Sequence, residues 1–182
     1  MTPLLTTANR QPPTDNRQLT TDNSPKPMPH LRAESTTTID APHERVYAII
    51  ADYHHGHPSI LPKENFRDLK VEQGGVGAGT IITFTSRSGG VERHYRMQVS
   101  EPRPGVLVEQ DLSSSLTTTF IVVPLDGGAR SQVTIATEWD ASKGLMGLVE
   151  RLFYPPAMRA IYKKELAQLA AVASEHAGAG TA

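Results

Sequence analysis

The chain of 182 residues is long enough for one domain with a single hydrophobic core, and its formal net charge of −1 argues against nucleic acid as a partner. It contains no cysteine, which excludes disulfide bonds, a thiolate nucleophile and a thiolate metal site, and which fits a cytoplasmic protein. No apolar run approaches the roughly 20 residues needed to cross a bilayer, so we expect no transmembrane segment.

The first 30 residues are predicted to form a disordered tail. They are rich in Thr, Pro, Asn, Gln and Asp and hold few aliphatic side chains, so they cannot bury enough surface to offset the entropy of ordering. Leu4 and Leu5 are followed directly by polar residues, unlike the sustained apolar segment of a secretory signal. We hypothesise that Met28 is the natural start. One domain is expected over residues 31–175, followed by a flexible tail over residues 176–182.

The domain is predicted to begin with a polar strand at residues 34–39 and two helices. The strand ends at residues 40–42, where Pro42 fits the first turn of a helix because its missing N–H has no partner there. An apolar face then follows, formed by Val46, Tyr47, Ile49 and Ile50. A short second helix is expected around residues 59–61.

Six segments with period-two alternation come next and are predicted to be strands. They are residues 66–72, 80–87, 91–101, 106–111, 116–125 and 130–139. The breaks between them are short and rich in Gly, Pro or Ser, which is the chemistry of hairpin turns. Loops this short predict antiparallel neighbours.

The last predicted element is a helix over residues 145–173, with apolar residues at three-and-four spacing. Pro155 and Pro156 remove two backbone donors, so we expect a kink or a restart of the helix there. Because a long amphipathic helix must bury its apolar stripe, it is expected to pack on the sheet. The predicted fold is α+β: a seven-stranded antiparallel sheet curled around the last helix, with two short helices between the first two strands.

Short motifs at the junctions of these elements resemble the START-like (SRPBCC) superfamily, in particular its polyketide cyclase/dehydrase and lipid-transport branch. They are residues 39–47 at the start of the first helix, Leu61-Pro62, residues 75–80 and Tyr95-Arg96-Met97. The resemblance covers about residues 33–173, and the order of the elements is its most specific part. It implies a helix-grip fold whose hollow, between sheet and last helix, holds apolar molecules. It supports binding better than any particular reaction.

Alternation along the strands assigns one set of side chains to the inner face. The predicted ligand-binding residues are Leu61, Ile82, Phe84, Tyr95, Met97, Val108, Phe120, Ile135, Trp139, Phe153, Met158 and Tyr162. The alternative is that these side chains fill a solid core. The inner polar residues Arg93, Tyr95, Thr118 and Thr137 favour a ligand or ordered water, because buried polar atoms need partners.

Two motifs suggest cofactor chemistry at first sight, and neither carries it. Residues 54–57 read His-His-Gly-His, but neighbouring histidines in a loop do not easily converge and no carboxylate or cysteine of ligand spacing accompanies them. We expect these histidines at the cavity entrance or on the surface, with no metal. Residues 74–79 are rich in glycine but match neither the dinucleotide-binding fingerprint nor the P-loop, and they are predicted to form a hairpin turn. No cofactor is expected.

Three functions stay open. We favour a non-catalytic binder or carrier of a small hydrophobic ligand that is lipid-, polyketide- or isoprenoid-like. The alternatives are a cyclase or dehydratase-like lyase that uses the same cavity, and a protein-interaction module with an exposed apolar patch. The candidate catalytic residues are Arg93, Tyr95, His57 and Glu165. Glu165 is expected to be solvated beside Lys163 and Lys164, and Arg93 to form an ion pair.

Overall fold

The computed structural model describes residues 30–88 and 90–175. The two predicted tails and the hypothesis about Met28 lie outside the described residues, except that His30 is the first residue of the first strand. The described residues form one sheet, three α-helices and one short 3₁₀ helix.

The elements follow the predicted order and are longer than predicted at several ends. They are β1 (His30–Ile39), α1 (His43–Ala51), α2 (Gly56–Ile60), β2 (Phe66–Gln73), β3 (Ile81–Ser88), β4 (Val91–Arg103), β5 (Val106–Asp111), β6 (Thr117–Leu125), the 3₁₀ helix η1 (Asp126–Gly128), β7 (Arg130–Asp140) and α3 (Gly144–Glu175).

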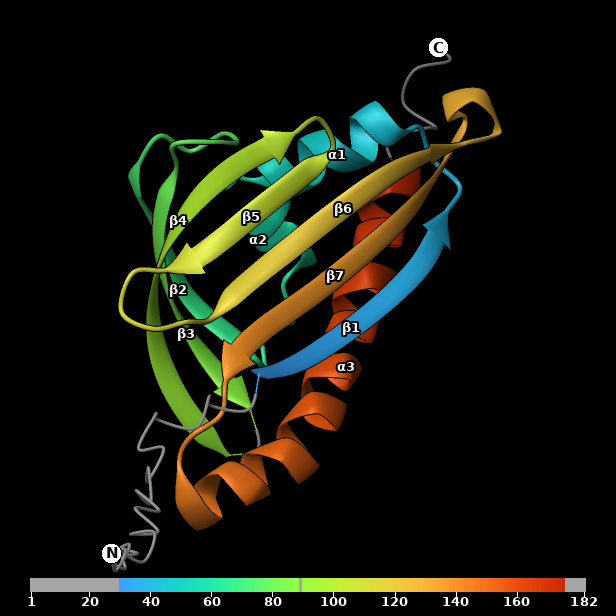
Figure 1. Cartoon of the computed structure of the whole chain (residues 1–182). Coiled ribbons are helices and arrows are strands. Elements are labelled where there is room, and N and C mark those ends of the chain that lie inside the picture. Colours follow the sequence, from blue (N-terminus) through green and yellow to red (C-terminus); the bar gives the residue numbers. More distant parts are fainter. Residues whose placement is uncertain (1–29, 89, 176–182) are drawn as a thin grey trace, which may run out of the picture.

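The seven strands form a single antiparallel sheet in the order β1-β7-β6-β5-β4-β3-β2. The two edge strands, β1 and β2, are consecutive in the sequence, and α1 and α2 connect one edge of the sheet to the other. Figure 1 shows the sheet curving around α3, with α1 and α2 at one end. The predicted helix-grip fold is confirmed.

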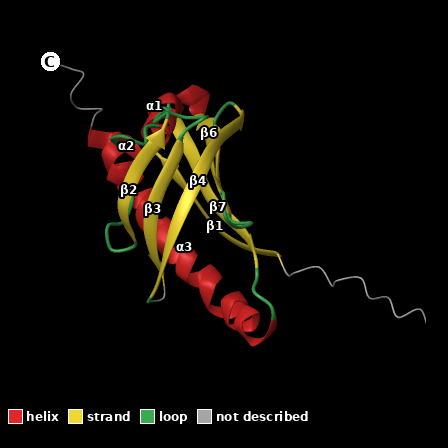
Figure 2. Cartoon of the chain, turned by 90° about the vertical axis from the view of Figure 1, so that its left-hand side faces the viewer, coloured by secondary structure: helices red, strands yellow, loops and turns green. Residues whose placement is uncertain are grey.

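The helix α3 runs across the concave side of the sheet (Figure 2). It continues through Pro155 and Pro156, so the helix does not restart there. Figure 1 shows that its first turns run in a different direction from the rest. Apart from Gly147, the buried face begins at Pro155 and continues through Met158, Tyr162, Leu166 and Leu169.

The first turns of α3 extend beyond the ends of the strands (Figure 1) and leave apolar side chains exposed. These side chains are Leu145, Met146, Leu148, Val149, Leu152 and Phe153. Phe153 is 63% exposed, so its predicted place in the cavity is wrong. Helical spacing assigned it to the buried stripe, but no strand lies beneath that part of the helix to cover it. Among the described residues, no helix is long and apolar enough to cross a membrane.

Candidate functional site

A hollow lies between α3 and the concave face of the sheet. Its cavity volume is about 50 Å³, counted as the space open to the centre of a water-sized sphere. By the same measure one buried water needs roughly 10–15 Å³, so the hollow is larger than a single water site. The predicted ligand-binding residues that line it are Leu61, Ile82, Phe84, Tyr95, Met97, Phe120, Trp139, Met158 and Tyr162. The structure therefore brings together most of the residues that the sequence predicted to line the hollow.

Besides Phe153, two predicted residues do not line the hollow. Ile135 is fully buried but belongs to the packed core. Val108 lies on the other face of β5, because Leu107 pairs with Phe120 and Glu109 pairs with Thr118, which turns these two β5 residues inward. Alternation had placed the apolar Val108 inward, and this choice put the acidic Glu109 on the wrong face.

Glu109 is an acidic residue of the lining that the sequence prediction missed. Its carboxylate is 5% exposed and its Oε1 accepts a hydrogen bond of 2.7 Å from the Tyr53 hydroxyl. Burial, and next the charge of Glu109, raise the pKa of Tyr53 well above its ordinary value, so this phenol keeps its proton as a donor. Alternation alone offered no decisive signal, because both faces of β5 carry valine or leucine.

His57 lies beside this pair and is buried, which corrects the expectation of a surface or entrance position. Its ring stacks on Tyr53 at 4.6 Å between centroids. Its Nδ1 lies 2.8 Å from the carbonyl oxygen of Ile50, so Nδ1 carries a proton and donates it, because a carbonyl only accepts. The other nitrogen, Nε2, lies 3.6 Å from Oε1 of Glu109. His57 therefore directs one nitrogen into the hollow.

The short turn between α1 and α2 brings His57 to this place. Gly56 packs so closely on α1 that a Cβ there would lie 2.3 Å from the carbonyl oxygen of Ile49. His54 and His55 are exposed, whereas His57 is buried. In the described part of the chain, no three His, Asp or Glu side chains come together as metal ligands do.

Glu165 is buried in α3 and lines the same hollow, so the expected solvated position is wrong. It lies on the buried stripe between Tyr162 and Leu166, whereas Lys163 and Lys164 face outward. Its Oε1 has no hydrogen-bond partner among the described residues. Burial, and next the charge of Glu109, raise the pKa of Glu165 well above its ordinary value of 4.5.

The inner hydroxyl groups satisfy one another. Thr118 and Thr137 are joined by a hydrogen bond of 2.8 Å between their Oγ1 atoms, and Thr137 is also bonded to the Tyr162 hydroxyl. Burial raises the pKa of Tyr162, which therefore stays protonated. These threonines do not need a ligand to complete their hydrogen bonds, which corrects that part of the sequence argument.

Arg93 and Tyr95 lie towards the other end of the hollow. The Arg93 guanidinium donates a hydrogen bond of 2.7 Å to the Tyr154 hydroxyl and its Cζ lies 5.0 Å from the centre of that ring. Within the described residues Arg93 has no carboxylate partner within 4.0 Å, so the expected ion pair is absent. Burial, and next the charge of Tyr154, raise the pKa of Tyr95 to about 12.

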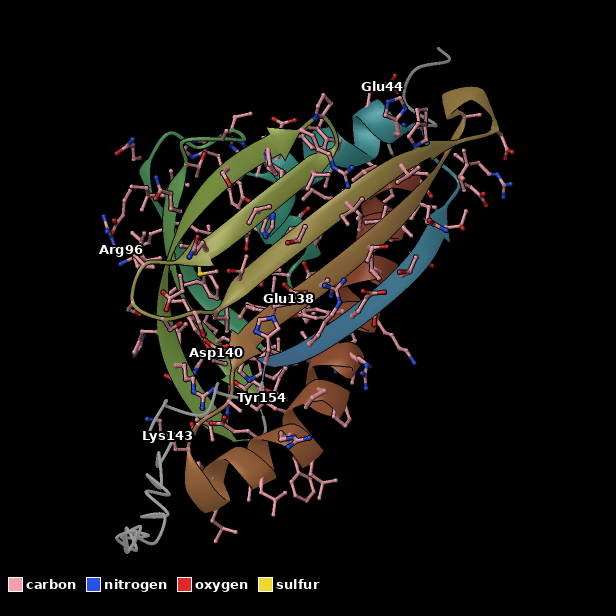
Figure 3. All side chains as sticks on the ribbon, viewed as in Figure 1. Glu44, Arg96, Glu138, Asp140, Lys143 and Tyr154 are labelled. Carbon is pink, nitrogen blue, oxygen red and sulfur yellow. The ribbon has the colours of Figure 1, made fainter. Side chains whose placement is uncertain are left out.

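Trp139 packs edge-on against Tyr154, with 5.6 Å between their ring centroids. Figure 3 labels Tyr154 on α3 and Asp140, the residue that ends β7. Because Tyr154 and Glu165 both line the hollow, it follows α3 for eleven residues, which is about 16 Å of helix. One end of the hollow is therefore aromatic and the other is acidic.

Residues 30–174 match the sequence profile of the family described as polyketide cyclase / dehydrase and lipid transport. The chain belongs to this family. No curated protein matches the chain.

Solved structures agree with this assignment to the polyketide cyclase/dehydrase and lipid transport family. KanY is 30% identical over 81% of this chain and 99% of its own, with a TM-score of 0.70. The Zhui aromatase/cyclase from Streptomyces sp. R1128 is 16% identical over 84% of this chain and 99% of its own, with a TM-score of 0.70. A START superfamily protein from Mycobacterium smegmatis is 12% identical over 81% of this chain and 99% of its own, with a TM-score of 0.63. The last two likenesses concern the fold alone.

Proposed function

We propose that this member of the polyketide cyclase/dehydrase and lipid transport family binds a small, mostly apolar ligand in the hollow between the sheet and α3. The observation that carries the proposal is the lining itself. Aromatic and aliphatic side chains from β2, β3, β4, β6, β7 and α3 surround a space that α3 and the sheet do not fill. Pockets of this composition, with a few polar groups at fixed positions, are typical of ligand-binding sites.

The volume of the hollow sets the ligand's size and the movement that binding requires. The cavity volume of about 50 Å³ is far smaller than that of a site for a sterol-sized ligand. Met97 and Met158 line the hollow, and methionine side chains adapt easily because they are unbranched and have three rotatable bonds. We therefore propose a slender ligand that displaces these two side chains.

A direct test uses Trp139, the single tryptophan of the chain, as a reporter within the lining. Titration with 4-phenylbutan-1-ol is expected to change Trp139 fluorescence and to saturate. Ser86→Phe places a large ring in the hollow and is expected to abolish the change. Ser100→Phe makes the same substitution at an exposed position of β4 and is the matched control. Binding that survives Ser86→Phe would contradict the proposal.

Native mass spectrometry of the purified protein supplies a second test. A bound apolar molecule that co-purifies with the wild type and is lost in Ser86→Phe would support the proposal. Its presence in Ser100→Phe would show that the loss is specific to the hollow.

A cyclase or dehydratase-like activity is the second candidate, and Glu165 favours it. A carboxyl group whose pKa is raised by burial holds its proton to a higher pH than an exposed one, which suits it to act as a general acid towards a carbonyl or hydroxyl group of a polyketide-like substrate. In that case, Glu165→Gln is expected to remove turnover of a linear poly-β-ketone while binding of 4-phenylbutan-1-ol survives. Turnover by the Glu165→Gln variant at the wild-type rate would contradict this catalytic role of Glu165.

A further inference from the structure

The hollow is unequal in charge along its length. Its lining contains the carboxyl groups of Glu109 and Glu165, and no Lys or Arg of the described residues lines it. Both carboxyl groups lie at the end formed by α2, β5 and the middle of α3. A group that enters this end therefore meets two carboxyl groups and no lysine or arginine side chain.

The two carboxyl groups differ in how they are satisfied. Oε1 of Glu109 already accepts a hydrogen bond from Tyr53 and lies near His57. Oε1 of Glu165 has no partner among the described residues, although the residue is only 2% exposed. A buried carboxyl oxygen without a donor is costly, so Glu165 is the position at which a ligand gains most by donating.

The surroundings of Glu165 supply no positive side chain that could fill this role. The titratable groups that face it are Glu109 from β5, His57 from α2, Tyr53 from the turn after α1, and Tyr162 from α3 itself. The two tyrosines are neutral donors engaged elsewhere, with Glu109 and Thr137. His57 donates from Nδ1 to a backbone carbonyl and directs Nε2 towards Glu109.

Resting on the proposed ligand-binding function, we propose that the hollow takes an apolar amine, with its ammonium group against Glu165 and its apolar body along α3 towards Trp139. An ammonium group supplies the missing donor, and it supplies the counter-charge once Glu165 gives up its proton. A ligand with a carboxylate end would add a third acidic group beside Glu109 and Glu165, and like charges at such distances repel strongly in a poorly solvated site. The distance of about 16 Å along α3 from Glu165 to Tyr154 is long enough for a phenylalkyl chain.

An amine and a neutral ligand are expected to differ in the number of protons released on binding. Burial raises the pKa of Glu165, so the free protein holds this proton to a higher pH than an exposed glutamate does. An alkylamine is cationic, with a pKa near that of lysine, about 10.4. Below the raised pKa of Glu165, forming the ion pair therefore releases one proton from Glu165 to the solvent. Binding of an amine should therefore strengthen by up to about tenfold per pH unit until Glu165 ionises in the free protein. Binding of the corresponding alcohol releases no proton.

The test compares three probes of one shape on the full chain: 4-phenylbutylamine, 4-phenylbutan-1-ol and 5-phenylpentanoate. Calorimetry in two buffers with different ionisation enthalpies gives both affinity and proton release. We expect the amine to bind about tenfold or more tightly than either other probe and, at a pH below the raised pKa of Glu165, to release up to one proton. Glu165→Gln is expected to remove both the preference and the proton release while the alcohol still binds. Glu175→Gln, an exposed change on the same helix, is expected to leave all three unchanged.

Three results overturn the inference, and they separate it from the proposed function. Equal binding of amine and alcohol to the wild type overturns the amine preference and leaves the ligand-binding proposal in place. An amine preference that survives in Glu165→Gln overturns the role of Glu165. Failure of all three probes to bind, with no change in Trp139 fluorescence, overturns the amine inference together with the proposed function.

Discussion

The hydroxyl of Tyr53 donates a hydrogen bond of 2.7 Å to Oε1 of Glu109, and both residues are buried at the acidic end of the hollow. This contact joins the turn after α1 to β5, two regions that are 56 residues apart in the sequence. It stabilises the buried side chain of Glu109, because a carboxylate in the protein interior is unfavourable without a hydrogen-bond donor.

Removal of this donor should destabilise the fold. Tyr53→Phe leaves Glu109 with His57 as its remaining close polar neighbour, and we expect the free energy of unfolding to fall by about 1–3 kcal/mol. Urea denaturation measures the change. In a Glu109→Gln background the same substitution should cost less, because the charged acceptor is gone. Equal costs in the two backgrounds would show that the hydrogen bond contributes little.

The stability of the protein should depend on pH through Glu165. Burial raises the pKa of this carboxyl above 4.5 in the folded protein, so the folded state holds its proton to a higher pH than the unfolded chain does. The stability that this proton supplies is complete below about pH 4.5 and is lost as the pH rises through the raised pKa. Glu165→Gln cannot lose a proton there.

The measurement compares unfolding free energies of the wild type and Glu165→Gln across this pH range. We expect the difference between them to shift in favour of the variant by at most about 1.4 kcal/mol per pH unit. Glu175→Gln should follow the wild-type curve, since Glu175 is exposed at the end of α3. Parallel curves for wild type and Glu165→Gln would contradict the burial of an unpaired carboxyl.

Two leucines of α3 allow the same substitution to be compared in opposite settings. Leu166 is 3% exposed and Leu152 is 65% exposed. Leu166→Ala is expected to cost about 2–5 kcal/mol because it leaves a cavity in the core. Leu152→Ala should change the stability by less than about 0.5 kcal/mol. Thermal or urea unfolding distinguishes them, and similar costs would mean that the first turns of α3 are covered in solution.

Gly56 should tolerate no side chain. A Cβ at this position would lie 2.3 Å from the backbone oxygen of Ile49, and a backbone atom cannot move aside as a side chain can. Gly56→Ala is expected to shift α2 and to cost about 1–3 kcal/mol. The slowly exchanging Nδ1 proton of His57, which is donated to Ile50, should disappear from the NMR spectrum. Its persistence, with unchanged stability, would show that α2 keeps its place.

The sequence predicted the element order and most of the apolar lining because period-two strands, short turns and one long amphipathic helix determine the layers. It did not predict which face of β5 points inward. Both faces of that strand carry valine or leucine, and only its pairing with β6 places Glu109 inside. The position of Glu165 was predictable from helical spacing, since it lies on the stripe of Tyr162 and Leu169.

For Phe153 the helical periodicity was predicted correctly, but the predicted buried environment was wrong. The helical pattern continues past the end of the sheet, and periodicity carries no information on where the covering layer stops. Contacts between side chains distant in the sequence, such as Tyr53 with Glu109 or Arg93 with Tyr154, were likewise beyond local patterns. These contacts define the chemical character of the hollow.

The pairing of β1 with β7 also affects how the protein is made. His30 lies opposite Asp140, 110 residues later, so β1 is synthesised well before the strand that it pairs with. Pairings that span so much of the chain close slowly, because a large loop must be ordered first. During translation the edge of β1 stays without its native neighbour until β7 emerges, so the sheet is completed only after β7 has been synthesised.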